Sequence, residues 1–154
     1  MPTIPMMEEI QFSQAKSHLS EIMDDVVHRE RPTAVRRERG KQEMMYLLPR
    51  EVLDAAVGAA RVRVDYLPDE EGIGLWVNDF EIGAHGATVE AARQNLVREV
   101  RAYVANFLGQ LHVYLTWPDR ARLVPQVLRL AVARSDEELA RLIFFVPDHD
   151  QAGP

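Results

Sequence analysis

The stretch FSQAKSHLSEIMDDVVHRERPTAVRRERGKQEMMYLLPREV, residues 12–52, decides the fold of the first part of this chain. Its first third predicts a helix over residues 13–28, because apolar residues recur there at helical spacing. Ser13 has the side chain of a good N-cap, and Pro32 disfavours helix in the residue before it. The apolar positions of this predicted helix are Ala15, Leu19, Ile22, Met23 and Val26.

A β-hairpin is predicted after this helix. Residues 33–37 are typical of a strand, and residues 44–48 form an apolar return strand. The turn between them contains Gly40, which can adopt positive φ. Pro49 suits the start of a second helix. Before the first helix, residues 8–12 predict a short edge strand.

The second part of the chain predicts three strands and a long helix. Residues 61–66 alternate as in a half-buried strand, and residues 73–77 and 82–85 predict two more. Thr88 caps a long helix with one apolar face, and Gly109 ends it. We place a junction between two modules at residues 58–60.

The C-terminal region gives mixed signals. Leu111, Val113, Leu115 and Trp117 alternate with polar or aromatic residues, which predicts a fourth strand over residues 111–117. Residues 119–133 are apolar, but Pro125 prevents a continuous helix, and helix and strand both stay open. Ser135 and Glu138 have the spacing of a capping box and open a last helix.

Length and composition limit the class of protein. The 154 residues suffice for one compact domain or two small ones, and 47% are hydrophobic, enough to bury a core. Without cysteine the chain can form neither disulfides nor thiolate metal sites. No apolar run reaches the roughly 20 residues that span a bilayer, and the N-terminus lacks a signal-peptide pattern. We therefore expect a cytoplasmic protein without membrane contact.

Catalytic motifs are absent from the sequence. It contains no glycine-rich phosphate loop, no paired-histidine motif and no serine elbow. The five histidines are scattered, and none pairs with another at metal-ligand spacing. We expect no cofactor, no metal and no enzymatic activity.

Charge is distributed unevenly. The chain has a net charge of −6, all of it in residues 51–154, whereas residues 1–50 are balanced. Within the balanced part, residues 29–41 hold six basic residues against two acidic ones. Arginine binds phosphates and guanine edges, so this patch suits nucleic acid. The alternative, that these arginines form salt bridges on a solvated face, is equally compatible with the composition.

The same stretch resembles the Phd/YefM family of bacterial antitoxins. The resemblance is carried by residues 13–16 (SQAK), 19–22 (LSEI), 35–40 (VRRERG) and the strand 44–48, about a third of the chain. It implies a dimer that binds operator DNA and neutralises a toxin. Lysine stands at position 16 where the family usually has arginine, which places bidentate contact there in question.

The resemblance also implies functional residues. Those expected to contact DNA are Lys16, Arg36, Arg37 and Arg39. Those expected at the dimer interface are Leu19, Ile22, Met44, Tyr46 and Leu48.

Residues 62–107 are similar to the HicB-like antitoxin module. The matching pieces are residues 64–66 (VDY), 69–72 (DEEG), 78–80 (NDF) and 88–92 (TVEAA). The Leu-Pro-Gly-Cys usual after the second strand is absent, and residues 81–84 (EIGA) stand in its place. Any small ββα unit would give a comparable pattern.

Together these observations predict an α+β protein of two modules. Residues 1–58 form a βαββα, Phd/YefM-like module for DNA binding and dimerisation. Residues 61–147 form a βββα(β), HicB-like module with a C-terminal helix, and residues 148–154 a tail. The predicted function is an antitoxin of a type II toxin–antitoxin system that represses its own operon as a dimer and binds its toxin through the C-terminal half. The alternative is a protein-interaction or assembly module without DNA binding.

Overall fold

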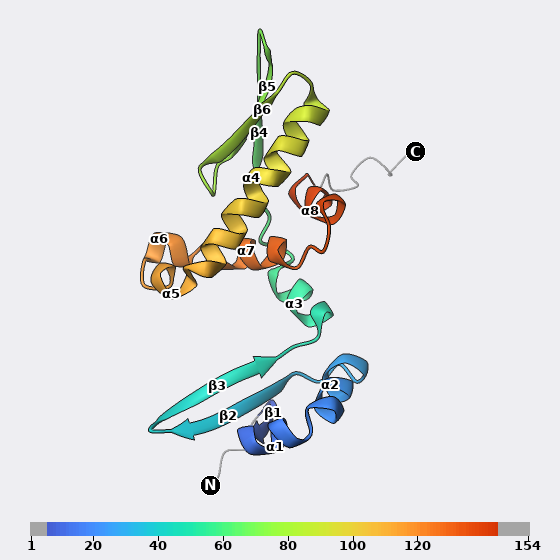
Figure 1. Ribbon diagram of the computed structural model, residues 1–154, viewed down its shortest axis with the longest axis vertical. Helices are drawn as coiled ribbons and strands as arrows, with labels where there is room; N and C mark the ends of the chain where they lie inside the picture. Colours follow the sequence, from blue (N-terminus) through green and yellow to red (C-terminus); the bar gives the residue numbers. More distant parts are fainter. Residues whose placement is uncertain (1–5, 145–154) are drawn as a thin grey trace. The chain divides into compact units, whose positions relative to one another are not determined.

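The computed structural model describes residues 6–144, and these residues form two units with separate cores. The first unit ends at Ala56 and the second begins at Val57. Both units combine helices with one small sheet, as Figure 1 shows, so the predicted α+β class is confirmed. The predicted end of the second module at residue 147 and the tail 148–154 lie outside the described residues.

The first unit is a three-stranded sheet with two helices against it. The sheet order is β1-β2-β3, with β1 parallel and β3 antiparallel to β2. Strand β1 leads directly into the helices (Figure 1), and α3 begins at Arg50, the residue after Pro49. The elements are β1 Glu8–Gln11, α1 Phe12–Ser17, α2 Leu19–His28, β2 Thr33–Arg39, β3 Lys41–Leu47 and α3 Arg50–Val57.

A small apolar core holds this unit together. Ala15 of α1, Ile22 and Val26 of α2, and Val35 of β2 are buried against one another. Since strand side chains alternate between faces, the helices cover the face of the sheet that carries Val35. Gly40 joins β2 to β3 with φ +69°, as its place in the predicted turn requires.

The predicted single helix over residues 13–28 is wrong in two details. The helix begins one residue earlier, at Phe12, with Gln11 of β1 at the N-cap position, so Ser13 is not the cap. It also breaks at His18, whose backbone has φ −126° and ψ +30°. The His18 ring nitrogen Nδ1 lies 3.2 Å from the Gln14 carbonyl oxygen, which also accepts from the His18 backbone amide. This local contact accompanies the division into α1 and α2.

The second unit packs one long helix on an antiparallel sheet. The sheet has the order β4-β5-β6, and α4 contacts β5 and β6 (Figure 1). The Thr88 hydroxyl accepts from the Ala91 amide at 3.1 Å, so the predicted cap is confirmed. The elements are β4 Val64–Asp69, β5 Gly72–Val77, β6 Ile82–Gly86 and α4 Val89–Gly109.

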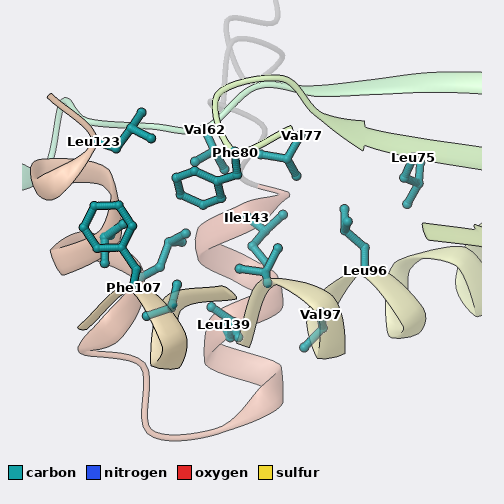
Figure 2. Close-up of a cluster of buried hydrophobic side chains, with 14 of the residues drawn as sticks. Val62, Leu75, Val77, Phe80, Leu96, Val97, Phe107, Leu123, Leu139 and Ile143 are labelled. Carbon is teal, nitrogen blue, oxygen red and sulfur yellow. The ribbon is translucent and has the colours of Figure 1, made fainter. Parts of the chain in front are cut away.

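The core of the second unit lies between the sheet and the helices. Figure 2 shows Leu75 and Val77 of β5 facing α4, with Phe80, Phe107 and α8 side chains packed beside them. Phe80 stacks on Tyr103 with ring centroids 4.4 Å apart. Farther along the chain, Arg129 is buried and donates to the Leu142 carbonyl at 2.9 Å, which ties α7 to α8.

The predicted fourth strand over residues 111–117 is wrong. Residues 111–114 are helical, and the short helices are α5 Leu111–Tyr114, α6 Pro118–Ala121, α7 Val124–Ala131 and α8 Asp136–Ile143. Burial follows a spacing of three, because Leu111 and Tyr114 pack on the core while Leu115 and Trp117 stay exposed. The alternating pattern of residues 111–117 therefore does not correspond to the burial of their side chains.

The undecided region over residues 119–133 is helical. Pro125 lies in the first turn of α7, where its missing amide costs nothing because that amide has no helical partner. The Ser135 hydroxyl caps α8 by accepting from the Glu138 amide at 3.1 Å. The Glu138 carboxylate accepts from the Arg134 amide at 3.0 Å. None of the helices within residues 6–144 combines the length and apolarity required to cross a membrane.

Replacing Leu96 with alanine tests whether the α4 core stabilises the second unit. Leu96 is fully buried, so we expect a loss of about 2–5 kcal/mol in the free energy of unfolding. Urea unfolding followed by tryptophan fluorescence measures this unit selectively, because Trp76 and Trp117 both belong to it. Leu108→Ala, on the same helix but 38% exposed, is the control and should cost far less. Equal losses would contradict the placement of this core.

Candidate functional site

The basic residues of the first unit lie on two opposite faces of its sheet. Val35 faces the helices, so Arg37 and Arg39, two and four residues later on β2, share that face. Arg36 points to the other face, together with Ala34. The structure therefore separates Arg36 from the other predicted DNA contacts.

Arg37 is held by a carboxylate and by an aromatic ring. Its Nε donates to Glu43 Oε2 at 2.6 Å, from the register partner on β3. Its guanidinium also lies 5.2 Å from the centre of the Phe12 ring on α1. These contacts fix the orientation of a cation that stays partly exposed.

Arg36 is ion-paired on the other face. Its Nε lies 2.9 Å from Glu9 Oε1 on β1, and its Nη1 lies 3.8 Å from Glu38. The side chain is 31% exposed. For Arg36 and Arg37, the structure thus shows the salt bridges that the composition left as an alternative.

Lys16 and Arg39 are exposed and, within the described residues, form no ion pair. Lys16 lies one helical turn after Phe12, so it shares the side of α1 on which Arg37 is held. Arg39 is the register partner of Lys41 across Gly40. Like charges directly opposite each other destabilise a hairpin, and within residues 6–144 neither cation of this pair forms an ion pair with a carboxylate. Lys41 was not among the predicted DNA contacts. It shares the face of Arg37 and Arg39, and we call Lys16, Arg37, Arg39 and Lys41 together the basic surface.

The predicted dimer residues fall into three places. Ile22 is 7% exposed and belongs to the core of the unit. Leu19 lies on the outer side of α2, where Met23 and Val27 continue an exposed apolar stripe at intervals of four residues.

Met44 and Tyr46 lie on the open face of the sheet. They are the register partners of Arg36 and Ala34, so they point away from the helices, and both are exposed. Leu48, just after β3, is also exposed. The stripe of α2 and the open face therefore lie on opposite sides of the sheet.

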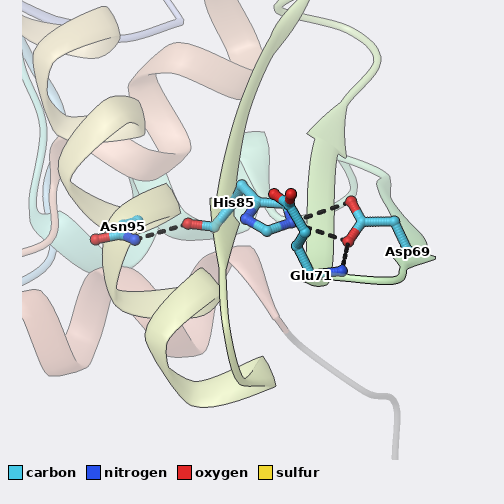
Figure 3. Close-up of polar contacts among 4 residues, drawn as sticks. All are labelled: Asp69, Glu71, His85 and Asn95. Carbon is cyan, nitrogen blue, oxygen red and sulfur yellow. Dashed lines mark hydrogen bonds and ion pairs between the residues drawn. The ribbon is translucent and has the colours of Figure 1, made fainter.

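In the second unit, a histidine and an aspartate meet across the sheet. His85 Nε2 of β6 lies 3.0 Å from Asp69 Oδ2 of β4, as Figure 3 shows. The Glu71 backbone amide donates to the same carboxylate at 2.9 Å. On the other side of β6, Asn95 of α4 donates to the His85 carbonyl at 2.8 Å. The hydrogen bond from His85 and the amide of Glu71 hold the pKa of Asp69 below its usual value.

These charged groups do not assemble a metal site. Among residues 6–144, no three histidine, aspartate or glutamate side chains are grouped so that they could hold a metal ion.

Comparison with known proteins gives the family. The profile of the PHD-like family, described as "Antitoxin of toxin-antitoxin, RelE / RelB, TA system", matches residues 6–145. The chain belongs to this antitoxin family. Membership of an antitoxin family implies that the protein has a cognate toxin as its partner. No curated protein matches the chain.

A solved structure shares the fold of this antitoxin. It is the crystal structure of an antitoxin part of a proposed toxin/antitoxin system from Syntrophomonas wolfei subsp. wolfei. The TM-score is 0.74 at 17% identity, and the match covers 90% of this chain and 97% of the other. At this identity the likeness concerns the fold.

The Asp69–His85 contact predicts a shifted titration. In His85→Ala, the pKa of Asp69 should rise towards 3.8, because the largest cause of its depression is gone. A carboxyl whose folded pKa is depressed stabilises the fold above its unfolded pKa, and this contribution disappears as pH falls through the folded pKa. Carboxyl-detected NMR titration measures the pKa, with His112→Ala as the control. An Asp69 pKa that is unchanged in His85→Ala would contradict the contact.

Proposed function

We propose that this antitoxin binds operator DNA as a dimer, represses its own operon, and neutralises its toxin through the C-terminal half. The observation that carries the DNA part is the basic surface formed by Lys16, Arg37, Arg39 and Lys41. Two of its cations, Arg39 and Lys41, oppose each other at the hairpin end, and neither forms an ion pair in the described part of the chain. A phosphate at that end would relieve their repulsion.

Within this basic surface the residues have different roles. Arg37 is oriented by Glu43 and Phe12, which suits a contact of fixed geometry. Lys16, Arg39 and Lys41 are exposed long side chains that suit phosphates. Arg36 is ion-paired with Glu9 on the opposite face, and we assign it a structural role.

The proposed dimer uses the open face of the first sheet. Met44 and Tyr46 present apolar surface there with no element of the unit covering it in the described part of the chain, and the exposed Leu48 follows directly after β3. A second copy would bury this surface by two-fold symmetry and place two basic surfaces on one assembly. Such a pair matches the two half-sites of a palindromic operator.

We also propose that the first unit is a Phd/YefM-like module and that the second is a HicB-like module. The order of strand, helices, hairpin and helix in the first unit supports the former. The order of three strands and a long helix in the second supports the latter. A regulatory role without catalysis fits the antitoxin family.

A second candidate is an interaction module that does not bind DNA. It is favoured by the ion pairs of Arg36 and Arg37, which occupy two of the four predicted DNA contacts. The acidic balance of the chain also favours it. Binding to DNA distinguishes the two candidates.

Replacing Arg39 tests the basic surface. Arg39→Ala should weaken binding to the DNA upstream of its own gene. It should also lower the salt dependence of log K by about 1.8, the share of two phosphate contacts, one from each protomer of the proposed dimer. Arg37→Ala should also weaken binding. Arg101→Ala, which removes an ion-paired arginine of the second unit, is the control. Fluorescence anisotropy at two salt concentrations, with random DNA beside the upstream DNA, measures both effects. Absence of binding to either DNA at low salt would favour the second candidate.

Replacing Tyr46 tests the dimer face. Tyr46→Glu introduces a charge on the open sheet face, and we expect the dimer to dissociate into monomers because an unpaired charge would be buried. Leu19→Glu, on the outer stripe of α2, should leave the dimer intact. Sedimentation velocity reports the mass of each variant. The reverse pattern would move the interface to α2.

A further inference from the structure

The second sheet has a face that α4 does not cover. Leu75 and Val77 of β5 are buried towards α4. The residues that alternate with them on β5, and the register partners of those residues on β4 and β6, therefore point the other way. We call this the outer face. It consists of Asp65, Leu67 and Asp69 of β4, Gly74 and Trp76 of β5, and Gly83 and His85 of β6.

Glycines make the outer face flat around one tryptophan. The Trp76 ring lies over Gly83, its register partner, where a Cβ would come within 2.9 Å of the ring atom Cε3. Gly74 separates Leu67 from His85 in the next row. The His85 side chain reaches across β5 to Asp69 on β4. The outer face is thus a platform with Trp76 and Leu67 as its apolar groups.

These apolar groups are exposed within the described residues of their own unit. Leu67 is 58% exposed and Trp76 37% exposed. In the described part of the unit, the helix that packs closely on this sheet is α4, on the other side. An exposed tryptophan fixed by its neighbours is typical of the residues that dominate protein interfaces.

The rim of the outer face is acidic. Asp65 and Asp69 lie on the face itself, with Arg63 and His85 as their partners. Beside them, at the β4–β5 turn, Glu70 and Glu71 are exposed and form no ion pair within residues 6–144. Such a rim attracts a basic partner, and it disfavours a second copy of the same face through like-charge repulsion.

We propose that the outer face is the docking surface for a basic face of the cognate toxin, with Trp76 as the central anchor. This inference rests on the proposed toxin binding by the C-terminal half and assigns it to one surface. In the complex, the side chains of Trp76 and Leu67 are buried against the toxin and lose their contact with water. The carboxylates at the rim raise the rate of association with a basic protein, and salt reduces that effect.

The test uses the full chain and the purified product of the reading frame adjacent to its gene as the toxin probe. Biolayer interferometry measures the affinity of the unmodified chain first. Trp76→Ala should weaken it by at least about tenfold, mainly through faster dissociation. Glu70→Gln with Glu71→Gln should slow association at low salt and flatten its salt dependence.

Trp117→Ala is the matched control. Trp117 is the other tryptophan of this unit, 53% exposed and outside the outer face, so its loss should leave the affinity unchanged. Circular dichroism verifies that the variants fold. The charge variants keep the shape of the side chains and test the surface even if Trp76→Ala proves unstable.

Each outcome decides a different point. Selective loss in Trp76→Ala together with the changed salt dependence supports the outer face. An affinity unchanged in both the Trp76 and the charge variants, while the unmodified chain binds, overturns the docking surface and leaves the proposed function intact. Failure of the unmodified chain to bind the probe counts against the proposed toxin binding itself. If Trp76→Ala changes the oligomeric state of the antitoxin in the absence of toxin, the outer face belongs to a contact with a second copy. That result overturns the inference.

Discussion

The close approach of α4 to β6 is the constraint on which the second unit depends. At Gly86 a Cβ would lie 2.3 Å from the Ala92 amide nitrogen, so only glycine lets the helix start this near the strand. From there α4 runs along the sheet and buries Leu96, Val100 and Phe107. One long helix can cover one face of a three-stranded sheet. The other face, with Trp76 and Leu67, is consequently left to solvent or to a partner.

The first unit is limited by the size of its core. Four buried side chains, one of them Val35 at the centre of the sheet, hold two short helices on one face. Units this small bury a low fraction of their surface and gain little stability alone. Apolar residues remain exposed on both sides, at Leu19 and at Tyr46. In the dimer that we propose, a second copy would cover one of these sides and would also bring two basic surfaces together.

Much of the fold could be predicted because local signals agree with the tertiary structure. Gly40 turns the hairpin, Thr88 caps α4, and Ser135 caps α8, each through its own backbone or a neighbouring amide. The sequence predicted where the basic residues lie, but it could not predict which arginines are ion-paired. Their partners, Glu9 and Glu43, come from other strands. The alternating pattern over residues 111–117 gave a wrong prediction of a strand. Tyr114 packs on Phe107 of α4, a contact that the pattern does not reveal.

The sequence by itself determined the caps of α4 and α8, the hairpin turn at Gly40 and the charge of each part of this antitoxin, because those properties depend on residues a few positions apart. Only the tertiary structure decided which arginines are paired, which apolar side chains are uncovered, and that residues 111–114 are helical. These features depend on which segments meet in space. Lys41 illustrates the difference, since its charge is evident in the sequence, but its place opposite Arg39 follows from the register of β2 and β3.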